Sequence, residues 1–163
     1  MQTVVNYIWL IPLLPLLGWA VIGLFGKSLS KNLVSIIGCG SVLGAFGMAV
    51  AIFFQLLNGE TKSFTVHLFD WIHAGNFIAD FSFLVDPLSS VFLLIITGIG
   101  FLIHVYSAGY MHDDEGFARF FAYLNLFIFF MLLLVLGSNY LLMFVGWEGV
   151  GLCSYLLIGF WFK

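Results

Sequence analysis

One acidic residue, Glu148, lies inside a long apolar stretch that contains no other charged residue before Lys163. A charged side chain in a membrane-spanning helix costs roughly 2.5 to 3.5 kcal/mol, so such residues usually face a protein interior or a wet cavity. Burial favours the protonated form of a carboxyl group, whereas a nearby cation favours the ionised form. A moving cation would therefore make Glu148 load and release protons, and we predict that it is a proton carrier. The alternative is a protonated carboxyl group that hydrogen-bonds across helices and only stabilises their packing.

Two further polar residues are expected at a similar depth in the membrane. At about 1.5 Å per residue, Glu148 lies roughly 13 Å from the start of its apolar run after Asn139. Asn125 lies eight residues into the preceding run from the opposite side, and Thr97 lies eleven residues after Asp86. Asn125 and Thr97 are therefore candidate neighbours of Glu148. The simpler interpretation is that each makes an interhelical hydrogen bond with no part in proton transfer.

His104 is expected near the inner end of its helix, on the opposite side of the membrane from the start of the Glu148 helix. Imidazole titrates near neutral pH, so His104 is a candidate proton relay. An interfacial histidine that hydrogen-bonds to water explains the residue equally well. Asp86 precedes Pro87, a combination typical of a helix N-cap followed by the first helical position. We interpret Asp86 first as a cap and only second as a proton-transfer residue.

The composition indicates an integral membrane protein. Of 163 residues, 63% are hydrophobic and only 8% are charged, against about 25% charged residues in soluble proteins. No basic patch is present, so nucleic acid is not an expected partner. Cys39 and Cys153 lack a CxxC partner and are expected to pack as small apolar residues. The sequence contains no phosphate loop, dinucleotide fingerprint, haem motif or zinc-ligand spacing, so we expect no metal or cofactor in this chain.

The predicted fold class is an all-α membrane protein with a short β-hairpin outside the bilayer. About 20 apolar residues span a membrane as a helix, and five runs meet this length: 7–26, 33–57, 85–106, 117–136 and 140–162. Short connections make neighbouring helices antiparallel. The one long connection, between the second and third runs, alternates in hydrophobicity around a turn signal and predicts a hairpin over 61–83.

The basic residues predict the orientation. Four of them fall on one side of the predicted spans and one on the other, namely Lys27, Lys31, Arg119 and Lys163 against Lys62. By the positive-inside rule, the N-terminus is outside and the C-terminus inside, and the hairpin faces outward. The first run lacks the basic start of a signal peptide and is expected to remain as an anchor.

The last predicted helix has two different faces. One stripe carries small residues, which let another helix approach closely, at Gly146, Gly149 and Cys153. Glu148 falls on a different face together with Gly151 and Tyr155. We expect both faces to contact protein, because an acid that faced lipid would be hard to insert.

Several blocks from Asp86 onward resemble one family, and the most specific contains Gly146-Trp147-Glu148-Gly149-Val150-Gly151. The blocks cover residues 86–89, 98–107, 109–111, 119–127 and 146–161. The sequence is similar to the antiporter-like L subunit of proton-pumping NADH:quinone oxidoreductase, respiratory complex I, whose mitochondrial counterpart is subunit 5. The resemblance is strong from Asp86 to the end and weaker before it.

The resemblance implies a fold of many transmembrane helices at the distal end of the membrane arm. It implies a proton channel in which the glutamate matching Glu148 pairs with a lysine on a later, broken helix. Quinone reduction elsewhere would drive pumping, and the FMN, iron–sulfur and quinone sites would belong to partner subunits. The implied partners are other membrane-arm subunits and the lipid bilayer. The implied location is the bacterial inner membrane, in preference to the mitochondrial inner membrane.

The chain departs from this family in length, because family members are several times longer. We therefore expect residues 1–163 to be the N-terminal part of an antiporter-like domain, inactive alone, with the missing C-terminal helices as its partner. A subunit of a multi-subunit Na⁺/H⁺ antiporter is an alternative, although the block 149–155 favours complex I. A structural membrane module without transport is the third interpretation.

Overall fold

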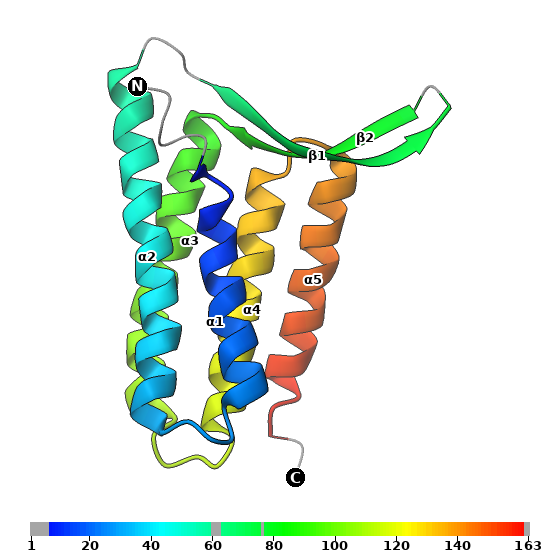
Figure 1. Cartoon of the computed structure of the whole chain (residues 1–163). Coiled ribbons are helices and arrows are strands. Elements are labelled where there is room, and N and C mark those ends of the chain that lie inside the picture. The colour runs from blue at the N-terminus through cyan, green and yellow to red at the C-terminus, as the bar shows by residue number, and fades with distance from the viewer. Residues whose placement is uncertain (1–6, 60–62, 76, 162–163) are drawn as a thin grey trace.

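Five helices stand side by side, and a two-stranded hairpin lies across one end of them (Figure 1). The computed structural model describes residues 7–59, 63–75 and 77–161. The elements in chain order are α1 (Leu10–Phe25), α2 (Lys31–Asn58), β1 (Phe64–Ala74), β2 (Phe77–Val85), α3 (Pro87–Tyr110), α4 (Phe117–Leu136) and α5 (Tyr140–Ile158). The prediction of five helices with a hairpin between the second and third is confirmed.

Four of the helices, α2 to α5, are long and apolar enough to cross a membrane. The first predicted span, 7–26, differs, because α1 has only 16 residues, about 24 Å at 1.5 Å per residue. Pro12 and Pro15 lie in the first two turns of α1. The difference lies mainly at residues 7–9, which form a turn and not regular α-helix, whereas the helix continues through both prolines to Phe25.

The helix ends follow local capping. Ser30 caps α2 through a hydrogen bond from the Leu33 amide, so the helix begins at Lys31 and not at residue 33. Asp86 caps α3 as expected. Its carboxylate accepts a hydrogen bond from the Ser89 amide at 2.7 Å, and the Ser89 hydroxyl oxygen accepts one from the Asp86 amide at 2.8 Å, which is a capping box. The last helix ends at Ile158 and not at residue 162.

The hairpin is antiparallel, and its register runs from Phe64 opposite Val85 to Ala74 opposite Phe77. Gly75 lies in the turn with φ of +61°, a backbone conformation that glycine adopts without strain. Residues 61, 62 and 76 of the predicted hairpin lie outside the described part of the chain. The hairpin crosses the ends of α3, α4 and α5 and extends beyond the bundle (Figure 1).

The helices pack unequally. α4 contacts each of the other four helices, whereas α5 packs mainly against α4 and forms an edge of the bundle. The core between them is apolar and includes the fully buried side chains of Ile11, Val42, Leu93, Leu132 and Leu142. Consequently α4 is the central helix, and one side of α5 stays open.

Candidate functional site

The helix that carries Glu148 is held at its first turn and along one face. The Asn139 side chain accepts a hydrogen bond from the Leu142 amide at 2.9 Å and so caps α5. Gly146, Gly149 and Cys153 are buried against α4, and a Cβ atom at Gly146 would lie 2.6 Å from the Leu134 nitrogen. A Cβ atom at Gly149 would overlap the Phe130 ring. The predicted small-residue stripe is therefore the packing face of α5.

Glu148 lies on the other side of α5, where its side chain is exposed. We call this side the open face of α5; its residues are Phe144, Glu148, Gly151, Tyr155 and Ile158, all exposed. Within the described residues, Glu148 makes no hydrogen bond or ion pair. The division of α5 into a packing face and an acid face is thus as predicted, but among the described residues no protein contact covers the acid face.

Asn125 lies on the opposite side of α4, in contact with α2. Its side-chain oxygen accepts a hydrogen bond from the Ser41 hydroxyl at 2.7 Å, and its amide donates to the Phe121 carbonyl at 3.0 Å. Gly18 of α1 and Gly38 of α2 make room for it, since a Cβ atom at either position would lie within about 3 Å of the Asn125 side chain. The structure therefore joins Asn125 to Ser41 and not to Glu148.

Thr97 is fully buried, and its hydroxyl donates to the Leu93 carbonyl of the same helix at 2.6 Å. A threonine that bonds back to its own helix needs no ligand to satisfy it. Among the residues that the structure describes, Thr97, Asn125 and Glu148 do not bond to one another. Ser41 is a partner of Asn125 that the sequence analysis does not predict. The signal available for it is a hydroxyl group within an otherwise apolar run.

His104 is buried between α3 and α4 and is only 1% exposed. It lies six residues before Tyr110, the last residue of α3, which is about 9 Å along the helix. The predicted helix ends at residue 106, four residues earlier, so the structure places His104 deeper in its helix than expected. The structure thus places His104 inside the bundle and not at an exposed end of α3.

The two ring nitrogens of His104 have different environments. Nδ1 lies 2.8 Å from the Gly100 carbonyl, and a carbonyl only accepts, so Nδ1 carries the proton. In the neutral ring Nε2 is then an acceptor, and it has no hydrogen-bond partner in the described part of the chain. The ring stands edge-on to Phe121 at 5.9 Å between centroids. A buried acceptor without a partner is costly unless water or a proton reaches it.

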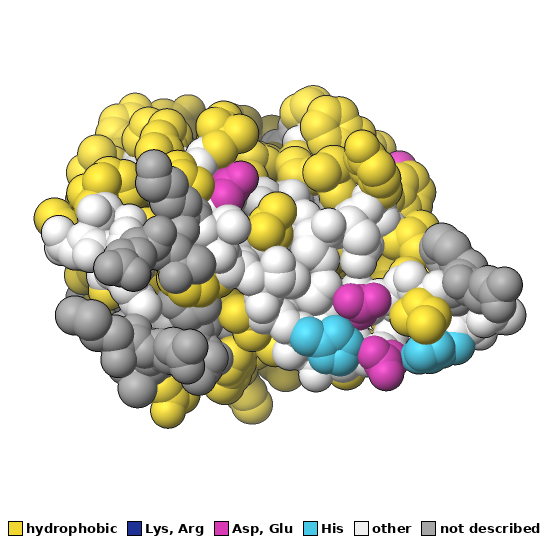
Figure 2. Space-filling model, turned by 90° about the horizontal axis from the view of Figure 1, so that it is seen from above, with side chains coloured by type: hydrophobic (Ala, Val, Ile, Leu, Met, Phe, Trp, Pro, Cys, Tyr) yellow, Lys and Arg dark blue, Asp and Glu magenta, His cyan; other side chains and the backbone are white. Residues whose placement is uncertain are grey.

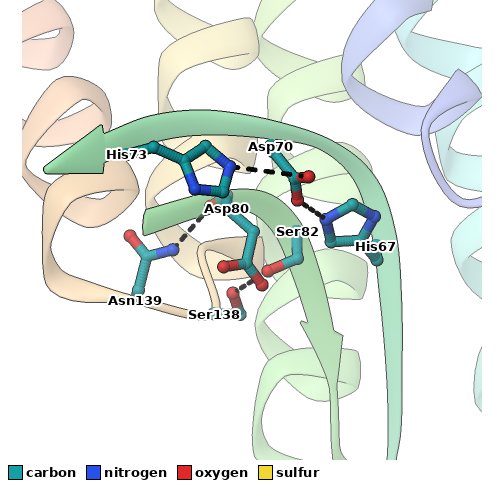
Figure 3. Close-up of polar contacts among 7 residues, drawn as sticks. All are labelled: His67, Asp70, His73, Asp80, Ser82, Ser138 and Asn139. Carbon is teal, nitrogen blue, oxygen red and sulfur yellow. Dashed lines mark hydrogen bonds and ion pairs between the residues drawn. The ribbon is translucent and has the colours of Figure 1, made fainter. Parts of the chain in front are cut away.

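The hairpin carries a polar cluster that was not predicted (Figure 3). His67 Nε2 lies 2.8 Å from one carboxylate oxygen of Asp70, and His73 Nε2 lies 3.6 Å from the other. Strict alternation would put His67 and Asp70 on opposite faces, but β1 has register shifts on both sides of Asp70, and bulges re-aim side chains. No three His, Cys, Asp or Glu side chains in the described residues are arranged to hold a metal ion.

The two ends of the bundle carry different kinds of charged side chain. The view onto the hairpin end shows histidines and acidic side chains, and no Lys or Arg among the described residues (Figure 2). The described basic residues lie at the other end, where Lys31 donates to the His112 carbonyl at 2.6 Å and Arg119 stacks 4.7 Å from the Phe160 ring. Lys62 and Lys163, which entered the predicted orientation, lie outside the described residues.

At the end of the bundle away from the hairpin, hydrogen bonds join the segment after α5 to the connection before α4. Asp114 accepts hydrogen bonds from the Trp161 indole nitrogen at 3.0 Å and from the Gly116 amide at 2.6 Å. These two bonds lower the pKa of the Asp114 carboxyl group, the Trp161 bond most. Arg119, Tyr123 and Tyr155 line a groove of about 500 Å³ beside this contact.

Comparison with known proteins identifies the family. Residues 71–121 match the family described as NADH-Ubiquinone oxidoreductase (complex I), chain 5 N-terminus. The chain is 47% identical over 159 residues to NADH-quinone oxidoreductase subunit L of Mycobacterium tuberculosis and 46% identical over 158 residues to that of Escherichia coli. It is 44% identical over 150 residues to NADH-ubiquinone oxidoreductase chain 5 of Hypocrea jecorina. The chain belongs to the subunit L and chain 5 family of NADH-quinone oxidoreductase.

The three alignments cover 96%, 96% and 92% of this chain. They cover 25%, 26% and 22% of the relatives, so the chain spans about a quarter of their length. The family resemblance expected from the sequence is confirmed. The family-model match includes β2 and α3, and therefore Thr97 and His104.

Proposed function

We propose that this chain is the N-terminal part, residues 1–163, of a proton-translocating membrane subunit of NADH-quinone oxidoreductase, and that Glu148 carries protons within it. The observation that carries the proposal is the position of Glu148. It is the only charged residue of α5, it lies mid-helix, and it occupies the face that is not packed on α4. An acid in such a helix is retained at a cost of roughly 2.5 to 3.5 kcal/mol, which a structural role alone does not require.

The open face of α5 is the place where the rest of such a subunit would pack. The relatives are about four times longer than this chain, and a bare carboxylate on a lipid-facing surface would be strongly disfavoured. A cation supplied by the covering helices would favour the ionised form of Glu148, and withdrawal of that cation would favour proton uptake. The chain alone has no such partner among its described residues and should not pump.

The proposed topology has five membrane spans, with the N-terminus and hairpin outside and the Ile158 end of α5 inside. The described basic residues Lys27, Lys31 and Arg119 all lie at the end away from the hairpin, as the positive-inside rule requires. α1 is short for a span, and its contacts with α2 and α4 inside the bundle support its membrane position.

The buried polar residues have secondary roles in this proposal. His104 is a relay, because its Nε2 atom is an acceptor enclosed by protein. Asn125, with Ser41, and Thr97 provide polar groups inside an otherwise apolar bundle and do not contact Glu148 directly. Asp86 acts as a helix cap, since both of its capping bonds are formed.

Electron transfer takes place elsewhere in this proposal. FMN, the iron–sulfur clusters and quinone are held by partner subunits, and this chain holds no cofactor. Its partners are the other membrane-arm subunits, the lipid bilayer and the later helices of the same subunit. The bacterial relatives favour the bacterial inner membrane as its location.

Replacement of Glu148 by Gln in the full-length subunit tests the function. Gln keeps the size and hydrogen bonding of a protonated Glu but cannot release a proton. The assembled complex should oxidise NADH while it moves fewer protons per electron into vesicles, and Glu115→Gln, in the exposed connection before α4, is the matched control. A normal proton-to-electron ratio in Glu148→Gln would instead support a structural role. Transport that depends on sodium would support the Na⁺/H⁺ antiporter alternative.

A further inference from the structure

Asn139 connects the hairpin to the helix that carries Glu148. Its side-chain oxygen accepts from the Leu142 amide at 2.9 Å, which caps α5. Its side-chain amide donates to the Asp80 carbonyl of β2 at 2.7 Å. One side chain therefore bonds simultaneously to the first turn of α5 and to a strand that lies 59 residues earlier in the chain, and Figure 3 shows it pointing at β2.

The two residues before Asn139 also contact β2. The Ser138 amide donates to the Ser82 carbonyl at 3.2 Å, and the two serine hydroxyl groups share a short hydrogen bond. Gly137 forms an isolated antiparallel bridge with Phe83. The connection between α4 and α5 is thus paired with β2 over three consecutive residues. We call this paired segment, 137–139 with Asp80, Ser82 and Phe83, the β2–α5 joint.

The strand in this joint also leads directly into α3. β2 ends at Val85, and the next residue, Asp86, forms the capping box of α3. Phe83 and Val85 are buried beneath the strand. A single strand therefore fixes the outer ends of α3, which carries Thr97 and His104, and of α5, which carries Glu148.

Two further contacts restrain α5. It packs against α4, where the Phe130 ring occupies the space beside Gly149, and the segment after it is held by the hydrogen bond between Trp161 and Asp114 at the end away from the hairpin. Glu148 lies nine residues after Asn139, roughly 13 Å along a rigid helix. Among the described contacts, the joint is the one that relates the position of α5, and with it Glu148, to the hairpin.

We propose that Asn139 is a positioning residue for Glu148, which transmits the position of the hairpin to α5. A displacement of the hairpin pulls on Asp80 and Ser82, and through Asn139 and Ser138 it shifts the first turn of α5 and with it the carboxyl group. The inference rests on the proposed role of Glu148, but the joint itself can be tested without measuring transport.

Two variants of the full-length subunit separate the two bonds of Asn139. In Asn139→Asp the carboxylate still accepts from the Leu142 amide, and a negative charge suits a helix N-terminus. It cannot donate to the Asp80 carbonyl, so only the hairpin side of the joint is released. In Asn139→Ala both bonds are lost. Asn32→Asp, the same change at an exposed position at the other end of the bundle, is the matched control.

Amide hydrogen exchange and carbodiimide labelling are the measurements. In Asn139→Asp the Ser138 amide should exchange at least fivefold faster than in wild type, the ratio expected for loss of one ordinary hydrogen bond, while the Leu142 amide stays within twofold. The rate at which dicyclohexylcarbodiimide modifies Glu148 in the assembled complex should change at least threefold in Asn139→Asp and not in Asn32→Asp.

Two results would overturn the proposal. The first is an unchanged Ser138 exchange rate in Asn139→Asp, because the joint would not depend on Asn139. The second is a released Ser138 amide with an unchanged labelling rate, because the joint would not position Glu148. Ser82→Ala weakens the same joint without altering the cap of α5, and it supplies the same two readouts if Asn139→Asp fails to assemble. The labelling rate reports the accessibility and protonation of the Glu148 carboxyl group and can be measured in a complex that does not pump, so failure of the proposed function, seen with Glu148→Gln, remains distinguishable.

Discussion

The hydroxyl group of Ser41 donates a hydrogen bond of 2.7 Å to the side-chain oxygen of Asn125 and joins α2 to α4 inside the bundle. Asn125 is fully buried, and Gly18 and Gly38 leave the space that it fills. This pair, and not a contact with Glu148, accounts for the polar residue in the middle of α4.

Ser41→Ala should destabilise the bundle, because it leaves the Asn125 oxygen buried without a donor. Interhelical hydrogen bonds in membranes contribute about 0.6 kcal/mol on average and up to roughly 1.7 kcal/mol, so we expect a loss of about 1 kcal/mol. Reversible unfolding in mixed micelles measures it. A double-mutant cycle with Asn125→Ala provides the control: if the two losses simply add, the bond contributes nothing.

Gly149→Ala should weaken the α4–α5 contact by about 1 to 3 kcal/mol, the usual cost of overpacking, because its Cβ atom would overlap the Phe130 ring. Gly151→Ala is the matched control in this chain, since a Cβ atom there meets nothing within 4 Å. The same unfolding measurement applies to both variants.

The Gly151 variant gives a second result in the full-length subunit. If later helices cover the open face of α5, Gly151→Ala should be harmless in the 163-residue chain but should reduce assembly in the full-length subunit. Equal tolerance in both settings would show that the open face is not covered at this position.

The helix and hairpin assignments were predictable because they depend on local signals. Long apolar runs, the Asp86-Pro87 start and the turn at Gly75 each indicate their element without help from distant residues. The packing stripe at Gly146 and Gly149 was predictable for the same reason. The start of α1 at Leu10 was not predicted, because hydropathy does not distinguish the turn at residues 7–9 from regular helix.

The partners of the site residues were harder to predict, since depth along a helix does not give rotation about it. Asn125 and Glu148 were placed at one level, yet Asn125 faces α2 and Glu148 faces outward. The cluster of His67, Asp70 and His73 depends on strand bulges that a simple alternation rule omits. The joint at Asn139 depends on contacts between residues 59 positions apart, which no local pattern encodes.

His104→Met should leave the stability of the bundle within about 1 kcal/mol of wild type. The change removes the bond to the Gly100 carbonyl, but it also removes a buried acceptor without a partner, whose penalty is about 1 to 3 kcal/mol. If His104 relays protons, pumping per electron in the full-length complex should fall at least twofold. A loss of stability without loss of pumping would assign His104 a packing role only.

Trp161→Phe should raise the pKa of Asp114 towards its ordinary value, because the indole bond is the largest cause of the lowered pKa. A lowered pKa in the folded state stabilises the fold above the unfolded-state value of the carboxyl group, and this stabilisation is lost as the pH falls through the folded-state value. Carbon-13 NMR of labelled aspartate carboxyl groups measures the shift. An unchanged Asp114 titration in Trp161→Phe would contradict the assignment.

Infrared difference spectroscopy of the assembled complex during NADH oxidation tests most directly whether Glu148 is protonated and deprotonated during turnover. We predict a change in the carbonyl stretch of a protonated carboxyl group on turnover, and this band should disappear in Glu148→Gln while the matched Glu115→Gln variant keeps it. A turnover spectrum in which the carboxyl band is the same in wild type and Glu148→Gln would contradict the account.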